Sequence, residues 1–468
     1  MIKKSFLHAL KASALAVTIS VLPFAHANAQ SLLRDTEIEE TLEDFTVPIL
    51  RAAGLSPRSV DIYLVNDSSL NAFVTRGQNI FLHSGLILEA DNPNQLKGVI
   101  AHEAGHIVGG HIVRSDYGSR SAYGSMLIAA GLGIAAILAG EGSAGALILG
   151  GSTQFGTLEV LSYSRINESA ADQYAANFME RTGQSGKGLI AFFEKFRAQE
   201  VLSQARRYPY FRGHPLSADR IDALRERVDE SPYTDIQDSA EDQHAHDMMK
   251  AKLRGFLEGP QLVFSRYPLS DQSQYARYAR AVAYFKGADL KNALKEIDSL
   301  IAEEPENPYF HELKAQILYE SGQGTDALPS ARRALELSPD APLLKIALAQ
   351  SLLETRDMPQ VDEAITLIKS ALQTEQGNSY AWYLLSTAYG QQSKEALAKY
   401  ASAERFYAIG DIQRARSFAQ RAKEDLPRNE PQWRRASDII VVADTELAKK
   451  KNKRRRPKPF TVSTSQAR

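Results

Sequence analysis

Apolar residues recur along this chain with different periods, and each period predicts a different element. Residues 78–82 place two polar residues before three apolar ones, a short apolar run that predicts a half-buried β-strand. Residues 92–108 predict an amphipathic helix, with Asn92 as its N-cap, Pro93 at its first position and Gln95 as a capping partner. The apolar stripe of this helix consists of Leu96, Val99, Ile100, Ile107 and Val108.

The second half of the chain repeats an alanine-rich helical pattern every 34 residues. Ala293 and Pro305 recur one period later within 327–339, a segment that resembles the second helix of a tetratricopeptide repeat. One later interval is longer by 17 residues, which predicts an additional helix over 380–390. We expect about four repeats, from near residue 275, stacked into a surface that binds protein or peptide. A purely structural role, packed against the first half, is the alternative.

A third pattern is a nearly uncharged stretch between Arg120 and Glu159, with a single charged residue inside it. Its two apolar runs, 126–139 and 146–149, are each shorter than the about 20 residues that a membrane-spanning helix needs. We therefore expect an insert over 121–151. It either packs as a helical hairpin against the core, or it touches a membrane or unfolded substrate.

The N-terminus indicates export. Lys3 and Lys4 precede an apolar run, and small residues end it at Ala27-Asn28-Ala29, which is the pattern of a secretory signal peptide over 1–29. No cysteine follows the cleavage site, because the chain has none, so a lipoprotein anchor is excluded and disulfides contribute no stability. We expect a periplasmic protein.

The opposite end is strongly basic, although the net charge of the whole chain is −1. Eight basic residues between 449 and 458 predict a disordered tail over 446–468. Export argues against nucleic acid as a partner, so we expect peripheral contact with anionic lipid, lipopolysaccharide or an acidic protein surface.

The candidate chemistry is concentrated in an H-E-x-x-H motif at 101–106. His102 and His106 are four residues apart, so they lie on one face of a helix and can bind one metal ion. Glu103 is turned by about 100° from them and can take a proton from a water that the metal activates. Neutral imidazoles and an open coordination position suit zinc. A chance match of the motif is the alternative.

A third ligand must come from elsewhere in the chain. Gly109 suits a longer motif that ends in histidine, but Ile112 stands at the required position. His111 is one residue short and would point away on a continuing helix, so it is a partner of a ligand or a surface residue. Glu168 and Asp172 share one face of a later helix, where Glu168 would bind zinc and Asp172 would orient a histidine. A solvated helix face is the alternative.

These motifs together resemble the gluzincin zinc peptidases, the family of the prenyl-protein (CAAX) endopeptidase and the heat-shock membrane protease. The matching segments are A-H-E-x-x-H at 101–106, S-R-x-x-E-x-x-A-D at 164–172 and H-P-L-x-x-D-R at 214–220. The expected fold is mainly α. An α+β gluzincin domain with a small edge sheet would span 30–260, and an α-helical repeat solenoid would span 261–445.

The resemblance also implies roles beside the metal. Asn71, Ala72 and Phe73 would form a strand edge that guides the substrate backbone by strand addition, and Arg220 would help to bind substrate. His214 would either donate a hydrogen bond to the oxyanion of the tetrahedral intermediate or occupy the fourth zinc position and keep the enzyme latent.

With the signal peptide and the repeats, the resemblance implies a periplasmic zinc endopeptidase that holds one Zn²⁺ per chain. It would degrade unfolded or stalled outer-membrane proteins and assist their assembly, and its repeats would meet the outer-membrane assembly machinery. The alternative is a chaperone or adaptor that acts through the repeats, with a latent zinc site. The remaining pair His244 and His246 lies in an acidic stretch and is expected to be exposed.

Overall fold

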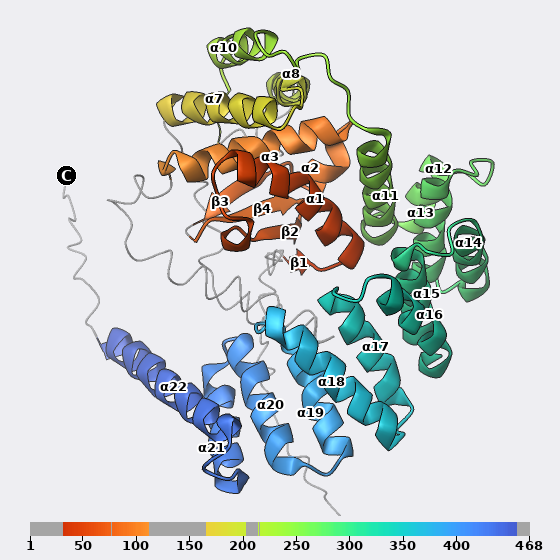
Figure 1. Ribbon diagram of the computed structural model, residues 1–468, viewed down its shortest axis with the longest axis vertical. Helices are drawn as coiled ribbons and strands as arrows, with labels where there is room; N and C mark the ends of the chain where they lie inside the picture. The colour runs from red at the N-terminus through yellow and green to blue at the C-terminus, as the bar shows by residue number, and fades with distance from the viewer. Residues whose placement is uncertain (1–30, 76, 112–164, 203–213, 215, 456–468) are drawn as a thin grey trace, which may run out of the picture.

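The structure is a computed structural model that describes residues 31–75, 77–111, 165–202, 214 and 216–455. These residues are mainly helical, which confirms the expected fold class (Figure 1). The first part of the chain forms one small sheet with strand order β1-β2-β4-β3. β2 and β4 run parallel, with Leu64 opposite Leu82, and the other neighbours run antiparallel. The strands are β1 (Ser31–Leu33), β2 (Ile62–Asn66), β3 (Ala72–Thr75) and β4 (Asn79–His83).

One central helix, α3, lies between this sheet and a second layer of helices (Figure 1). It contacts β3, β4 and α1 on one side and α7 and α8 on the other. The helices of this part are α1 (Thr36–Ala52), η1 (Pro57–Ser59), α2 (Ser84–Glu89), α3 (Pro93–Val108), α7 (Arg165–Arg181), α8 (Lys187–Leu202) and α10 (Ala218–Asp229).

The start of α3 follows its sequence signals. The side chain of Asn92 accepts a hydrogen bond from the Gln95 amide, and the Gln95 side chain accepts one from the amide of Asp91. The predicted stripe is buried at Leu96, Val99 and Ile100. Val108 is 38% exposed, because it is the last residue of the helix and stands beyond the core.

Close packing brings α7 against α3. A Cβ atom added to Gly105 would lie 2.9 Å from the carbonyl oxygen of Ala171, so only glycine permits this approach. The small residues expected to allow it are buried at Ala171, Ala175 and Ala176. Because the two backbones come so near, the first turns of α7 face the histidines of α3.

The second part of the chain is a series of stacked helices that follow a curve from α13 to α22 (Figure 1). α15 and α17 begin 34 residues apart, at Pro308 and Pro342, which confirms the predicted period. The helices are α11 (Ala240–Leu257), α12 (Pro260–Arg266), α13 (Gln274–Lys286), α14 (Leu290–Glu303), α15 (Pro308–Glu320), α16 (Gly324–Leu337), α17 (Pro342–Glu354), α18 (Met358–Thr374), α19 (Ser379–Gln391), α20 (Glu395–Ala408), α21 (Ile412–Asp425) and α22 (Pro431–Arg455).

The additional helix expected over 380–390 is α19, and α20 and α21 follow it as a pair. The expectation of a disordered tail from residue 446 is corrected in part, because α22 continues to Arg455. Alanine, glutamate, lysine and arginine predominate in this stretch and favour helix, so its positive charge does not end the helix.

Helix α11 belongs to both parts of the molecule. Its Met249 and Leu253 pack into the core of the sheet and α3, whereas Met248 and Ala251 pack among the first repeat helices. The domain boundary near residue 260 therefore stays a prediction. His246 on α11 is fully buried rather than exposed as expected, because this face of the helix packs on α2 and α3. Burial lowers the pKa of His246 to about 3.

Five residues join the two parts, and we name them the Lys252 cluster: Lys252, Glu37 and Tyr278 are buried, and Asp35 and Glu312 are half-buried. The Lys252 ammonium lies 2.7 Å from Asp35, 3.2 Å from Glu37 and 3.6 Å from Glu312, and the Tyr278 hydroxyl donates to Glu37 at 2.7 Å. Burial raises the pKa of Glu312 to about 7, although Lys252 opposes this shift. Burial alone would lower the pKa of Lys252, but Asp35, the Tyr278 hydroxyl, Glu37 and Glu312 raise it well above its usual value.

Three predicted features lie outside the described residues: the signal peptide over 1–29, the apolar insert over 121–151 and the last residues of the basic tail. In the part of the chain that is described, no helix is both long enough and apolar enough to cross a bilayer.

Candidate metal centre

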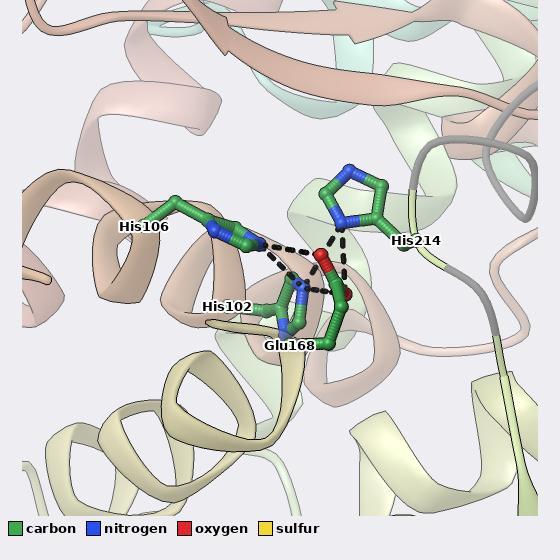
Figure 2. Close-up of side chains that lie close together, drawn as sticks. All are labelled: His102, His106, Glu168 and His214. Carbon is green, nitrogen blue, oxygen red and sulfur yellow. Dashed lines mark hydrogen bonds and ion pairs between the residues drawn. The ribbon is translucent and has the colours of Figure 1, made fainter. Parts of the chain in front are cut away.

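Four side chains from three parts of the chain converge on one point. His102, His106, Glu168 and His214 are all fully buried, and one candidate ligand atom of each lies within 4.8 Å of the others. Figure 2 shows that the two histidines of α3 project from consecutive turns toward Glu168, which comes from the first turn of α7. His214 enters from the segment before α10.

The spacing within this group is that of ligand atoms around a common centre. The Nε2 atoms of His102 and His106 lie 3.1 Å apart, and each is 3.4 Å from an oxygen of Glu168. The Nδ1 atom of His214 lies 3.2 Å from His102 Nε2 and 3.2 Å from Glu168 Oε2. His214 therefore presents Nδ1 to the group, whereas the α3 histidines present Nε2.

Glu103 stands beside the group but contributes no ligand atom to it. Its side chain is fully buried, and among the described residues neither of its oxygens accepts a hydrogen bond. The nearest basic atom is His214 Nε2, at 3.5 Å. Burial raises the pKa of Glu103, although the nearby imidazoles of His214 and His102 oppose that shift. A carboxylate in this setting favours gaining a proton.

Asp172 and Arg220 support the group from behind. Asp172 Oδ1 lies 2.9 Å from His102 Nδ1, as expected for a residue that orients this ring. The Arg220 guanidinium donates to Asp172 at 2.8 and 2.9 Å and lies 3.2 Å from Glu168. The structure thus places Arg220, predicted to bind substrate, in a buried position where its donors face two carboxylates.

The protonation of the two α3 histidines differs. Burial would lower the pKa of His102, but its contacts with Asp172 and Glu168 raise it to about 9. Burial and the neighbouring imidazoles hold the pKa of His106 well below its usual value. The pKa of Glu168 is far below its usual range, because His214 and His102 outweigh its burial. Protons and a metal ion would therefore compete for the same buried atoms.

The residues fit a divalent metal ion. Imidazole nitrogens and one carboxylate are the donor set that zinc prefers, and Cys is absent from the chain. Glu168 Oε1 accepts no hydrogen bond among the described residues. A buried carboxylate oxygen without such a partner is costly, and a cation at the centre of the group would remove that cost.

Comparison with known proteins agrees with this geometry. Residues 32–228 match the model of peptidase family M48, and residues 278–342 and 318–387 match two tetratricopeptide repeat models. The chain is an M48 peptidase with tetratricopeptide repeats. It is an enzyme of the metallopeptidase class, and the buried group is the metal site of that family.

The relatives of this chain differ in how much of it they cover. The chain is 25% identical to the beta-barrel assembly-enhancing protease of Escherichia coli K12 over 404 residues, which are 84% of this chain and 80% of that protein. It is 31% identical to the metalloprotease LoiP of the same organism over 177 residues, which are 37% of this chain and 63% of LoiP. It is 25% identical to the mitochondrial metalloendopeptidase OMA1 of Schizosaccharomyces pombe over 183 residues, 39% of this chain and 51% of OMA1.

The expected substrate strand of this M48 peptidase is β3. Asn71 is buried immediately before it, and Ala72 and Phe73 are its first residues. Among the described strands β3 pairs with β4 alone and so lies at the edge of the sheet, with Phe73 stacked on Phe81 at 5.0 Å. Packing of β3 on α3 places this edge beside the helix that carries the H-E-x-x-H motif.

One residue near the M48 metal centre departs from expectation in its direction, although a partner of a ligand was one of the two roles expected for it. His111 was expected to point away because the helix would continue, but α3 ends at Val108 and the chain turns back. His111 is buried, and its Nδ1 lies 2.9 Å from Nδ1 of His106. The pair Gly109-Gly110 was the signal for this, because consecutive glycines mark a helix end.

Proposed function

We propose that this M48 peptidase is a zinc endopeptidase, with one Zn²⁺ per chain bound by His102, His106 and Glu168. The observation that carries the proposal is the meeting of these donors in one fully buried group, with the carboxylate of Glu103 beside it. When bound, zinc polarises the scissile carbonyl and acidifies the attacking water.

Glu103 is the proposed general base and acid. Its carboxylate takes a proton from the attacking water and then delivers that proton to the leaving amine of the cleaved peptide. Burial raises its pKa, which strengthens it as a base, and its oxygens accept no hydrogen bond among the described residues. Nothing described therefore holds the carboxylate away from this task.

Asp172 is proposed to hold the ring of His102, so that Nε2 presents its lone pair to the metal. For Arg220 we propose a positioning role in place of the predicted contact with substrate. Its bidentate hydrogen bonds fix Asp172, and its third nitrogen faces Glu168, so it keeps two buried carboxylates in place.

His214 is proposed to gate the metal. Its Nδ1 lies within 3.2 Å of His102 Nε2 and of Glu168, which is where a fourth ligand would lie. The sequence left a second role open, donation to the oxyanion, and that role requires the ring to leave this position. Both roles are compatible in an enzyme that is latent while His214 occupies the fourth position. Upon activation the ring would move away and could then donate to the oxyanion.

The proposed substrate is an extended backbone segment of an unfolded protein that adds to the edge of β3 at Asn71, Ala72 and Phe73. Strand addition recognises backbone and tolerates many side chains, which suits a protease of unfolded proteins. The likeness to the beta-barrel assembly-enhancing protease supports unfolded or stalled outer-membrane proteins as clients and their assembly machinery as a partner. With the predicted signal peptide it also supports a periplasmic location, and the basic tail supports peripheral contact with a membrane.

A second candidate function is a chaperone or adaptor that acts through its repeats. The repeat helices follow a curve, as in repeat proteins that bind other proteins, and this observation supports a binding role (Figure 1). In that case the metal site would be latent for most of the time, and Glu103→Gln would retain the biological activity of the protein.

The deciding experiment measures degradation of an unfolded reporter protein by the zinc-loaded wild type, Glu103→Gln and His214→Ala. Cleavage by the wild type that is lost in Glu103→Gln supports an open peptidase with the assigned base. Cleavage by His214→Ala alone supports the gate. If none of the three cleaves, the adaptor function takes precedence.

A further inference from the structure

The ring of His111 lies against one of the two metal-binding histidines of α3. Its Nδ1 is 2.9 Å from His106 Nδ1, and the two rings stand at 74° with their centroids 5.1 Å apart. His111 is only 3% exposed, yet it contributes no atom to the four-atom group. It therefore contacts the far side of a proposed ligand without being a ligand itself.

Two glycines bring this ring into place. Gly109 ends α3, and Gly110 has a φ of +62°, in the left-handed region, so the chain reverses after the helix. The His111 ring then lies over Gly109. A Cβ atom on Gly109 would stand 2.3 Å from His111 Nε2, too near for the ring to stay, although the φ of −67° at Gly109 suits alanine.

The contact has a defined chemical meaning. A neutral imidazole has one N–H donor and one acceptor nitrogen. Nε2 of His106 faces the metal group, where it must offer its lone pair, so the hydrogen of His106 has to sit on Nδ1. That N–H points at His111 Nδ1, which must accept it and carry its own hydrogen on Nε2.

We propose that His111 is a positioning residue that fixes the tautomer and the ring orientation of His106 for metal binding. His111 Nδ1 accepts a hydrogen bond from Nδ1 of His106, as Asp172 accepts one from Nδ1 of His102. The acceptor is a neutral imidazole nitrogen in place of a carboxylate oxygen. This inference rests on the proposed function, because it requires that His106 binds the metal through Nε2. The competing explanation is that His111 only fills space at the end of α3.

The test measures the affinity of the full chain for Zn²⁺ alone by competition with a chromophoric chelator. His111→Leu fills space but accepts no hydrogen bond, whereas the side-chain oxygen of His111→Asn can occupy the place of Nδ1. We expect His111→Leu to weaken zinc binding about 10–100-fold, the range seen when such partners are lost, and His111→Asn to restore most of it. Equal affinities of His111→Leu and wild type, or an asparagine variant as weak as the leucine variant, would overturn the proposal.

A second set of variants keeps the imidazole and moves it. Gly109→Ala should lower zinc affinity in the presence of His111, and should lower it no further once His111 is leucine, because the displaced ring is then absent. If the losses of zinc affinity in Gly109→Ala and His111→Leu add up in the double variant, the proposal is contradicted, even where one variant is poorly folded. His246→Leu serves as control, since it alters a buried histidine that contributes no atom to the group and should leave zinc affinity unchanged. If the wild type binds no zinc, the proposed function itself fails, which these variants distinguish from a failure of His111 alone.

Discussion

Two clusters of charged side chains among the described residues, the Lys252 cluster and the metal centre, differ in where their positive charge comes from. In the Lys252 cluster, an ammonium group of α11 faces carboxylates of α1 and α15, so the cluster contains its own cation. In the metal centre, the carboxylates of Glu103, Glu168 and Asp172 are all buried, and Arg220 faces only the last two. The remaining positive charge must arrive as protons on the imidazoles or as a metal ion.

This difference separates a structural cluster from a functional one. The Lys252 cluster is complete without a ligand, and it joins residues that are 217 positions apart in the chain, Asp35 and Lys252. The metal centre is complete only when a cation enters, so its side chains are held ready by partners such as Asp172 and Arg220. A buried polar group that lacks its own counter-charge is therefore the better indicator of a binding site.

The largest expected effect is in the metal centre, and it should leave stability intact. Glu103→Gln should lower kcat by about 10²–10⁴-fold, because it removes the proton carrier. Its free energy of unfolding should stay unchanged or rise, since a buried carboxylate without hydrogen bonds is replaced by a neutral amide. Peptidase assays together with chemical denaturation check both statements. A marked loss of stability would mean that Glu103, like Lys252, supports the fold.

The reverse result is expected for the structural cluster. Lys252→Met leaves the buried Glu37 and the half-buried Asp35 and Glu312 without their cation. It should destabilise the protein by about 3–5 kcal/mol, while zinc affinity at neutral pH is retained. Lys314→Met is the matched control, because Lys314 forms a partly exposed ion pair with Asp298 that is worth at most about 1 kcal/mol. Similar losses in the two variants would show that the Lys252 cluster is no more than a surface ion pair.

Removal of the metal should act on one cluster only. Zinc at about 100 times its Kd is expected to stabilise the folded protein by about 2.7 kcal/mol, and a chelator should abolish this gain. Lys252→Met should show the same gain on zinc addition as the wild type. Thermal unfolding with and without chelator measures both quantities, and a gain that disappears in Lys252→Met would mean that the clusters are coupled.

The smallest effect, counted per pH unit, is a pH dependence of stability at the junction. The pKa of Glu312 is about 7 in the folded protein against 4.5 ordinarily, so the folded state binds more protons than the unfolded chain between these values. Stability from this group is fully present below pH 4.5 and is lost as the pH rises to 7, by at most about 1.4 kcal/mol per pH unit. Glu312→Gln should flatten the dependence in that window. Denaturation midpoints at pH 5, 6 and 7 provide the measurement, and an unchanged slope in Glu312→Gln would assign it to other groups.

The metal centre could be predicted from the sequence because its geometry is mostly local. His102 and His106 share one face of α3 with Glu103 beside it, and Glu168 and Asp172 share one face of α7, so helix periodicity alone places them. The period of the repeats could also be predicted from the sequence, because each helix pair packs mainly on its neighbours. Both predictions rest on contacts within or between adjacent elements.

Features that depend on distant or irregular backbone could not be predicted. The Lys252 cluster draws on α1, α11, α13 and α15, and no spacing in the sequence joins them. Contact with a ligand was one of the two roles predicted for His111, but the reversal at Gly110 that brings its ring there was not anticipated. The burial of His246 was missed because acidic neighbours in the sequence do not show which helix face is buried. The motif that contains Arg220 predicts contact with substrate. It does not show that the guanidinium pairs with Asp172 and Glu168.

The sharing of α11 between two cores has a consequence for how a client would be cut. Because one rigid helix packs on both the peptidase core and the first repeat, the distance between the repeat surface and the edge of β3 is fixed. Under the proposed function, a client held by the repeats can reach the metal centre only beyond a minimum number of residues from the held segment, because the chain between must span this distance. Cleavage positions would then follow length along the client rather than the side chains at the scissile bond.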